Sequence, residues 1–163
     1  MSRTVPVRLA LTVRDLEPAD LSDLGWSGGQ EHLRAMAALL QASYAGEVAV
    51  VVLALANEQL AACGVADFRP DPDLGLLHTL SVHERLQSLG LGTLLVAELE
   101  ERVRRRGVNR AQIAVEHDNP RAAALYRRLG YVEVGDRVES WPGAAGRTYV
   151  TVSTLLEHDL RTR

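Results

Sequence analysis

The sequence predicts an α/β fold of the α+β type, in which helices flank a mixed central sheet of about seven strands. The composition is that of a globular chain, because 47% of the 163 residues are hydrophobic and 24% are charged. Short apolar runs with strand periodicity alternate with longer runs of helical periodicity, in the order β-α-α-β-β-β-α-β-α-β-β. No internal repeat or linker interrupts this order, so we expect residues 1–163 to form a single domain.

The first expected element is a strand, because apolar side chains alternate with polar ones at Val5, Val7, Leu9, Leu11 and Val13. This alternation differs from the continuous apolar core of a secretion signal. The longest apolar run, residues 48–56, is too short to span a bilayer. We therefore expect a cytoplasmic protein without a membrane partner.

Two helices and three strands follow. Residues 16–24 predict a short helix, and residues 31–44 predict a longer one that ends before Gly46. One face of the longer helix carries Leu33, Met36, Ala37, Leu40 and Tyr44. Strands are expected at residues 47–55, 60–68 and 74–82, and the first two form a hairpin.

A turn with two glycines, Gly90 and Gly92, follows the third of these strands and opens an amphipathic helix that runs to Arg106. Glycine lets the backbone approach a ligand closely, and the first amides of a helix point outward with a partial positive charge. A phosphate group is therefore expected at this turn. Known nucleotide motifs fit poorly, because the chain contains no lysine and Leu95 replaces the third glycine of the dinucleotide fingerprint.

The remaining elements are a strand at residues 110–116, a short helix and two closing strands at residues 131–139 and 148–155. Asn119 is a suitable N-cap for the short helix, and Gly130 a suitable C-terminal residue. The last strand is expected to be a pairing edge for a homodimer.

Two sequence blocks resemble the Gcn5-related N-acetyltransferase (GNAT) family. The segment Gln87-Ser88-Leu89-Gly90-Leu91-Gly92 is similar to the family signature Gln/Arg-x-x-Gly-x-Gly/Ala, and Asn119, Ala124-Leu125-Tyr126 and Gly130-Tyr131 match a second block in the same order. The resemblance covers nearly the whole chain. It implies a mostly antiparallel sheet in which the fourth and fifth strands splay apart to admit acetyl-CoA.

The resemblance also implies which residues bind acetyl-CoA as a co-substrate. Backbone groups of the fourth strand would bind the pantetheine arm, the glycine turn would bind the pyrophosphate, and Tyr126 would lie beside the sulfur. The full set of expected cofactor-binding residues is Leu80, Ser81, Val82, Gln87, Ser88, Leu89, Gly90, Leu91, Gly92, Thr93, Asn119 and Tyr126.

Acetyl transfer to an amine requires an acid for the leaving thiolate and a base for the ammonium. Tyr126 is the expected general acid, because a phenol with a pKa of about 10 suits this task. Family members often place a glutamate where this chain has Leu74 or Ala114. His78 and Glu116 share strand faces with those positions and are the candidate bases, although His78 is also compatible with a packing role in the core.

The acceptor is expected to be an amine of a small molecule or peptide, and surface acids would suit a cationic one. Trp26 and Trp141 are candidate walls of the acceptor site, or pack under loops. A net charge of −3 gives no support for a nucleic-acid partner, and the histidines show no metal-ligand spacing, so no metal is expected. Cys63 is expected to be buried and to have a packing role in the core. The alternative function is an acyl-CoA-binding sensor with little or no turnover.

Overall fold

The computed structural model describes residues 2–6 and 8–161, which contain a sheet of seven strands in the order β1-β2-β3-β4-β5-β7-β6. Every neighbouring pair is antiparallel except β4 with β5, which is parallel. The predicted mixed, mostly antiparallel sheet is therefore confirmed. The strands are β1 (Leu11–Asp15), β2 (Val48–Leu55), β3 (Leu60–Asp67), β4 (Gly75–Val82), β5 (Arg110–Glu116), β6 (Val132–Pro142) and β7 (Thr148–Asp159).

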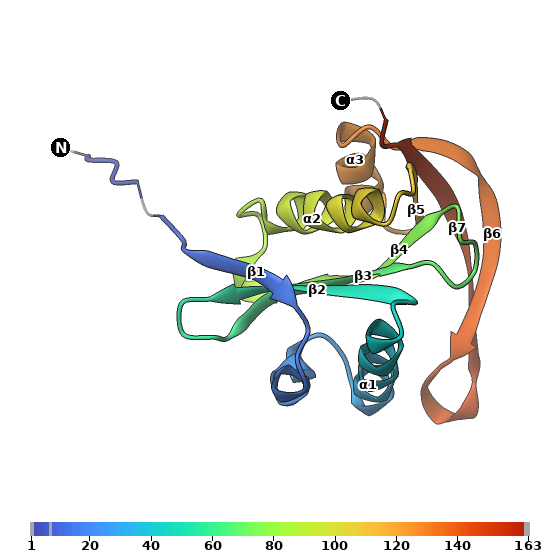
Figure 1. Ribbon diagram of the computed structural model, residues 1–163, viewed down its shortest axis with the longest axis horizontal. Coiled ribbons are helices and arrows are strands. Elements are labelled where there is room, and N and C mark those ends of the chain that lie inside the picture. Colours follow the sequence, from blue (N-terminus) through green and yellow to red (C-terminus); the bar gives the residue numbers. More distant parts are fainter. Residues whose placement is uncertain (1, 7, 162–163) are drawn as a thin grey trace.

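Helices cover both faces of the sheet (Figure 1). One face carries α2 (Leu91–Arg105) and α3 (Pro120–Arg128), and the other carries the 3₁₀ helix η1 (Pro18–Trp26) and α1 (Gln30–Tyr44). Each face of the sheet has its own hydrophobic core, and alternate residues of β2 contribute to one or the other. Val51 and Leu53 pack on the α2 side, and Val50 and Val52 pack on the α1 side. Each helix among the described residues is too short or too polar to cross a membrane.

The first strand is shorter than predicted. It begins at Leu11, while Val5 and Leu9 are 59% and 47% exposed and Val7 lies outside the described residues. The reason is the length of its partner, because Leu11 pairs with Leu55, the last residue of β2. An alternating pattern without a partner strand forms no ladder.

The buried face of α1 also differs from the prediction. Met36, Leu39 and Leu40 are buried, whereas Tyr44 is 64% exposed. Tyr44 is the final helical residue, after which the chain turns through Gly46 toward β2. The aromatic ring therefore lies at the end of the buried stripe and outside it.

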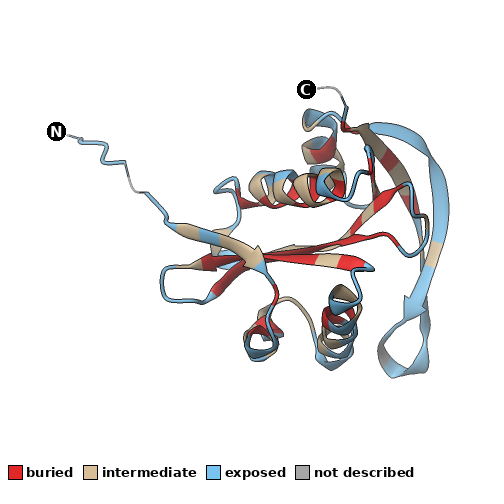
Figure 2. Cartoon of the chain, viewed as in Figure 1, coloured by how far each residue is buried: buried red, intermediate tan, exposed pale blue. Residues whose placement is uncertain are grey.

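The last strand is not an edge of the sheet, which corrects the predicted dimer edge. β7 lies between β5 and β6, with its register running from Val132↔Glu157 to Pro142↔Thr148. The edge strand at this side is β6. Together β6 and β7 form a long hairpin that extends past the rest of the sheet and is mostly exposed (Figures 1 and 2).

The predicted splay between β4 and β5 is present. Only the pairs Gly75↔Ala111, Leu76↔Gln112 and Leu77↔Ile113 join the two strands, and both continue beyond them. On its other side β4 bulges, because the register with β3 shifts between Cys63↔Ser81 and Val65↔His78. Two residues of β4, Thr79 and Leu80, therefore lie opposite Gly64.

Gly64 makes room for this bulge. A Cβ atom at Gly64 would lie 2.9 Å from Leu99 Cδ1 of α2 and 3.0 Å from Leu80 Cδ2. Any side chain at this position would force Leu99 or Leu80 to shift, so the glycine lets both leucines pack closely beside the bulge. Cys63 beside it is a buried free thiol, as predicted, and burial raises its pKa to about 11.

Candidate active site

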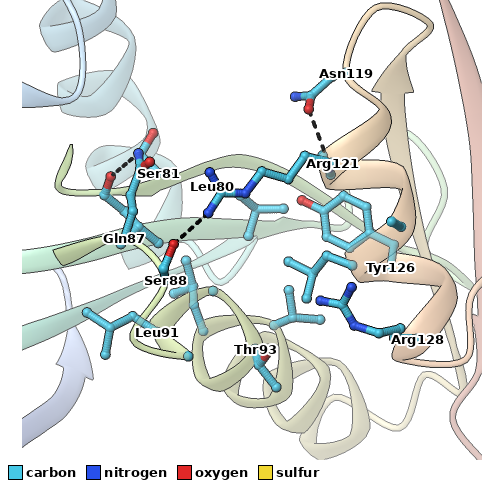
Figure 3. Close-up of a pocket in the computed structure, with 18 residues that line it drawn as sticks. Leu80, Ser81, Gln87, Ser88, Leu91, Thr93, Asn119, Arg121, Tyr126 and Arg128 are labelled. Carbon is cyan, nitrogen blue, oxygen red and sulfur yellow. Dashed lines mark hydrogen bonds between the residues drawn. The ribbon is translucent and has the colours of Figure 1, made fainter. Parts of the chain in front are cut away.

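A cavity of about 550 Å³ lies between the splayed end of β4, the start of α2 and one face of α3 (Figure 3). Eleven of the twelve residues expected to bind the cofactor line this cavity; the exception is Leu89, which is 61% exposed. We call this cavity the groove. The structure thus brings together segments of β4, the glycine turn and α3 that are far apart in the sequence.

The floor of the groove at one end is the start of α2. Gly90, the N-cap residue, has a left-handed φ of +83°, and its carbonyl accepts the first helical hydrogen bond, from the Leu94 amide at 3.1 Å. The amides of Leu91, Gly92 and Thr93 precede that bond and have no acceptor within the helix. They form a positive backbone end suited to an anion.

Two arginines of α3, Arg121 and Arg128, also line the groove and were not predicted. Arg121 Nη2 donates to Ser88 Oγ at 2.8 Å, which ties α3 to the glycine turn. The signal was present in the sequence as helical spacing, because positions 121, 125 and 128 share one helix face and Leu125 also lines the groove. Both cations add positive charge near the helix amides.

The splay leaves backbone groups of β4 open toward the groove. His83 donates its amide hydrogen to Ala61 of β3 at 2.8 Å, and Ser81 lies opposite Cys63. Because consecutive residues in an antiparallel ladder alternate between facing the neighbour and facing away, the backbone groups of Val82 face the splay. The Val82 carbonyl accepts a hydrogen bond from Gln87 Nε2 at 3.4 Å, and Leu80 lies within the bulge, where the alternation is interrupted.

A second cavity, of about 280 Å³, lies between β4, β5, α3 and β6. It brings together His78, Glu116 and Tyr126, the three residues expected to exchange protons, and we call it the acceptor cavity. Four residues line both cavities: Leu80, Asn119, Ala122 and Tyr126. The two cavities therefore share a wall, and Tyr126 is the residue of this wall that has an ionisable side chain.

Tyr126 is 8% exposed, and burial raises the pKa of its phenol. Its ring meets the ring of Tyr131 edge-on at 6.0 Å. In Figure 3 the side chain projects from α3 toward β4. Near neutral pH the phenol is protonated and can donate a proton or a hydrogen bond at the meeting point of the cavities.

His78 is held from two sides. Its Nε2 lies 3.3 Å from Asp67 Oδ2, and its Nδ1 lies 2.7 Å from Thr79 Oγ1. Burial lowers the pKa of His78, and although Asp67 acts in the opposite direction the net shift is downward. The imidazole is therefore neutral near pH 7 and has one nitrogen able to accept a proton.

Glu116, the other candidate base, lies across the acceptor cavity on β5. Its Oε2 accepts the hydroxyl hydrogen of Tyr149 at 3.1 Å. Asn119 caps α3 as predicted, accepting from the Ala122 amide at 3.2 Å. Asn119 thus has a structural role in addition to lining both cavities.

The two tryptophans occupy different places. Trp26 packs on His83 at 5.2 Å between ring centroids and lines a third cavity, of about 430 Å³, together with Leu80 to Val82 of β4. Its Nε1 is buried and lacks a hydrogen-bond partner among the described residues. Trp141 lines neither the groove nor the acceptor cavity; it packs on Tyr149 at 4.9 Å near the tip of the exposed hairpin.

The described residues contain no cluster of three or more His, Cys, Asp or Glu side chains arranged to hold a metal ion. The polar groups at the site are instead helix amides, guanidinium groups, a buried phenol and a histidine paired with a carboxylate.

The fold of this protein resembles that of several solved N-acetyltransferases. Over 93% of this chain and 96% of the other, it superposes on mutant forms of the spermidine/spermine N-acetyltransferase of Vibrio cholerae with a TM-score of 0.73 at 19% identity. The ribosomal-protein-S18-alanine N-acetyltransferase of Escherichia coli gives a TM-score of 0.65 at 21% identity, over 93% of this chain and 94% of that one. The model of the Acetyltransferase (GNAT) family matches residues 13–131, so the chain belongs to this family.

A sequence similarity to mycothiol acetyltransferases covers a smaller part of the chain. The protein of Beutenbergia cavernae is 38% identical over 65 residues, which are 40% of this chain and 22% of that protein. The protein of Paenarthrobacter aurescens is 33% identical over 63 residues, or 39% of this chain and 20% of that protein. The chain therefore matches about a fifth of the length of these curated relatives.

Proposed function

We propose that this protein transfers the acetyl group of acetyl-CoA directly to a primary amine of a small molecule or peptide. The observation that carries the proposal is the position of Tyr126, a buried phenol at which the groove and the acceptor cavity meet. One cavity has the charge and backbone groups for a phosphorylated thioester, and the other has the candidate bases for an amine.

The chemistry of the groove suits acetyl-CoA. The amides of Leu91 to Thr93 and the two arginines of α3 supply positive charge for the pyrophosphate. Backbone groups of Leu80 and Val82 line the groove and can pair with the amides of the pantetheine arm, which would replace Gln87 Nε2 as the donor to the Val82 carbonyl. The thioester then lies toward Tyr126.

The reaction needs no covalent enzyme intermediate. The amine nitrogen attacks the thioester carbonyl carbon, the C–S bond breaks, and its electron pair leaves on sulfur. Tyr126 then gives its phenolic proton to the thiolate, while His78 or Glu116 removes a proton from the amine. A backbone amide near Leu80 stabilises the oxygen on which negative charge develops.

Calorimetric titration with acetyl-CoA and dephospho-CoA, followed by thiol-release assays with polyamines, aminoglycosides, amino acids and peptides, tests this proposal. We expect binding, and thiol release with one amine class. Tyr126→Phe should lower kcat by about 10²-fold and leave acetyl-CoA affinity unchanged. Tyr44→Phe, at a residue 64% exposed, is the matched control. Absence of acetyl-CoA binding would refute the proposal.

A second candidate function is an acyl-CoA sensor of the same fold. It is favoured by Leu74 and Ala114, which stand where family members often place a glutamate base. Binding of acetyl-CoA without thiol release from any amine would support it. A cytoplasmic location and a homodimer are further proposals; the edge strand β6 is the strand that would pair in such a dimer.

A further inference from the structure

Asp67 is a fixed carboxylate behind the acceptor cavity. Asp67 is 4% exposed. Its Oδ1 accepts hydrogen bonds from the backbone N–H of Arg69 at 3.0 Å and from Arg69 Nε at 2.9 Å. Burial alone would raise the pKa of Asp67, but the hydrogen bonds from Arg69 and His78 outweigh it and lower the pKa to about 2. At neutral pH the Asp67 carboxylate is therefore ionised, so it accepts hydrogen bonds and donates none.

This carboxylate determines which nitrogen of His78 carries the hydrogen. Asp67 Oδ2 has no hydrogen to give, so the nitrogen beside it, Nε2, must be the donor in this 3.3 Å contact. In a neutral imidazole the other nitrogen, Nδ1, then has a free lone pair. It accepts the hydroxyl hydrogen of Thr79 at 2.7 Å.

The backbone at Thr79 is unusual. Its φ is +54°, and among the described non-glycine residues with positive φ it is the only β-branched one. In a regular strand, neighbouring side chains point to opposite faces. The left-handed turn within the β4 bulge instead lets His78 and Thr79 bond to each other and line the same cavity.

We propose that Thr79, His78 and Asp67 form a proton relay in which the Thr79 hydroxyl receives the proton of the acceptor amine. This proposal rests on the acetyl transfer proposed above. A hydroxyl that donates its hydrogen keeps lone pairs that accept one. Thr79 is the catalytic residue that touches the amine, and Asp67 is a positioning residue that acts through His78.

The step is balanced without another reactant. The ammonium N–H bond breaks, its electron pair stays on nitrogen, and the proton bonds to Thr79 Oγ1. The hydroxyl's own proton moves at the same time to His78 Nδ1. The imidazolium formed is paired with Asp67, and it later loses its proton to water.

The relay differs from catalysis by Glu116, which has its own partner in Tyr149 across the cavity. Removing only the Thr79 hydroxyl separates the two possibilities. Thr79→Val removes it and keeps the branched shape, while Thr79→Ser keeps it. Thr12→Val, at an exposed residue of β1, is the matched control.

We expect Thr79→Val to lower kcat by about 10²-fold without weakening acetyl-CoA, and Thr79→Ser to retain most of the activity. Histidine ¹⁵N NMR of the wild type, with acetyl-CoA but without an amine, should show His78 protonated on Nε2. The wild-type rate should rise with pH through the pKa of His78. Asp67→Asn should move this rise to lower pH, because the negative charge that favours the imidazolium is lost.

The pH profile is affected by every ionisable group at this cavity, so the interpretation depends on the comparison between variants. The groups that face His78 or share its cavity are Asp67, Arg69, Glu116, Tyr126, Arg137 and Glu139. Where Asp67→Asn fails to fold, the tautomer of wild-type His78 tests the same contact.

Full activity of Thr79→Val, or a wild-type His78 protonated on Nδ1, would overturn the relay and leave the proposed acetyl transfer intact. Acetyl-CoA binding without acetylation of any amine would overturn both. The two failures are therefore distinguishable.

Discussion

Tyr131 donates its hydroxyl hydrogen to the buried carboxylate of Glu100 over 3.0 Å. The same carboxylate oxygen lies 2.9 Å from His158 Nδ1, so three elements meet at one acidic group: α2, β7 and the residue before β6. The Tyr131 ring also supports the ring of Tyr126. The contact therefore links the packing of the core to the position of the proposed general acid.

Tyr131→Phe should lower the free energy of unfolding by about 1–3 kcal/mol, because a buried charged acceptor loses one of its donors. Urea denaturation measures this as a lower midpoint with an unchanged m value. Tyr44→Phe, at an exposed tyrosine, should leave the midpoint unchanged. Equal midpoints for wild type and Tyr131→Phe would contradict this role of the bond.

Gly90→Ala should weaken acetyl-CoA binding about tenfold, or ~1.4 kcal/mol. The left-handed φ of +83° disfavours a side chain, and relaxing it would move the helix amides that face the groove. Gly46→Ala is the matched control, because Gly46 has a φ of +72° and, like Gly90, open space around its Cα. Both variants should lose stability, and only Gly90→Ala should lose affinity in calorimetry. Equal affinities would show that the turn does not bind the ligand.

Arg128→Gln should weaken acetyl-CoA binding about tenfold at low salt and reduce the salt dependence of binding, because a cation that lines the groove is lost. The neighbouring Arg127 pairs with Glu133 and is absent from the groove lining, so Arg127→Gln should bind as the wild type does. Calorimetric titrations at two salt concentrations make the comparison. Equal losses for both variants would contradict a specific role for Arg128.

Asp67 should stabilise the protein only above a defined pH. Its pKa is about 2 in the folded chain and 3.8 ordinarily, so its contribution is complete above the ordinary pKa and is lost as the pH falls toward 2. Asp67→Asn should cost about 2 kcal/mol near pH 7, because each unit of pKa shift is worth about 1.4 kcal/mol. Urea midpoints at pH 7 and pH 3 should show the difference shrinking in acid. A difference that grows in acid would contradict the assignment.

Self-association should occur through β6, which with β1 is one of the two edge strands among the described residues and is the edge with several exposed valines. Val138 is 69% exposed and pairs across the hairpin with Val152, which is 39% exposed. Val138→Lys should convert a dimer to a monomer in sedimentation velocity. Val5→Lys, at an exposed residue outside the sheet, should not. A wild type that is monomeric at all concentrations would exclude the dimer.

Local signals in the sequence predicted most elements of the fold. Asn119 and Gly130 flank the two ends of α3, as expected. Gly107, with a φ of +84°, follows the end of α2. The predictions that were wrong concerned features that depend on residues distant in the sequence. The alternation before Leu11 could not show that β2 ends at Leu55, and no local pattern placed β7 between two other strands.

The candidate site was predictable where one motif contains its residues. The glycine turn and Tyr126 lie in such motifs, and they line the groove. The roles of Thr79 and Asp67 could not be inferred from the sequence. The side-chain contact of Thr79 with His78 depends on a bulge, and that of Asp67 depends on the pairing of β3 with β4. Sequence periodicity assumes regular strands and therefore fails where the backbone departs from one.

The short ladder between β4 and β5 has a mechanical consequence. Among the described residues, three residue pairs make up the strand-to-strand connection between β1–β4 and β5–β7. A ligand bound in the splay would contact both β4 and β5 and so connect the two halves of the sheet. A ligand that binds only the folded chain stabilises it by an amount that grows with the ratio of free ligand concentration to its Kd. If acetyl-CoA binds in the splay as proposed above, its addition should therefore raise the midpoint of unfolding in proportion to its affinity.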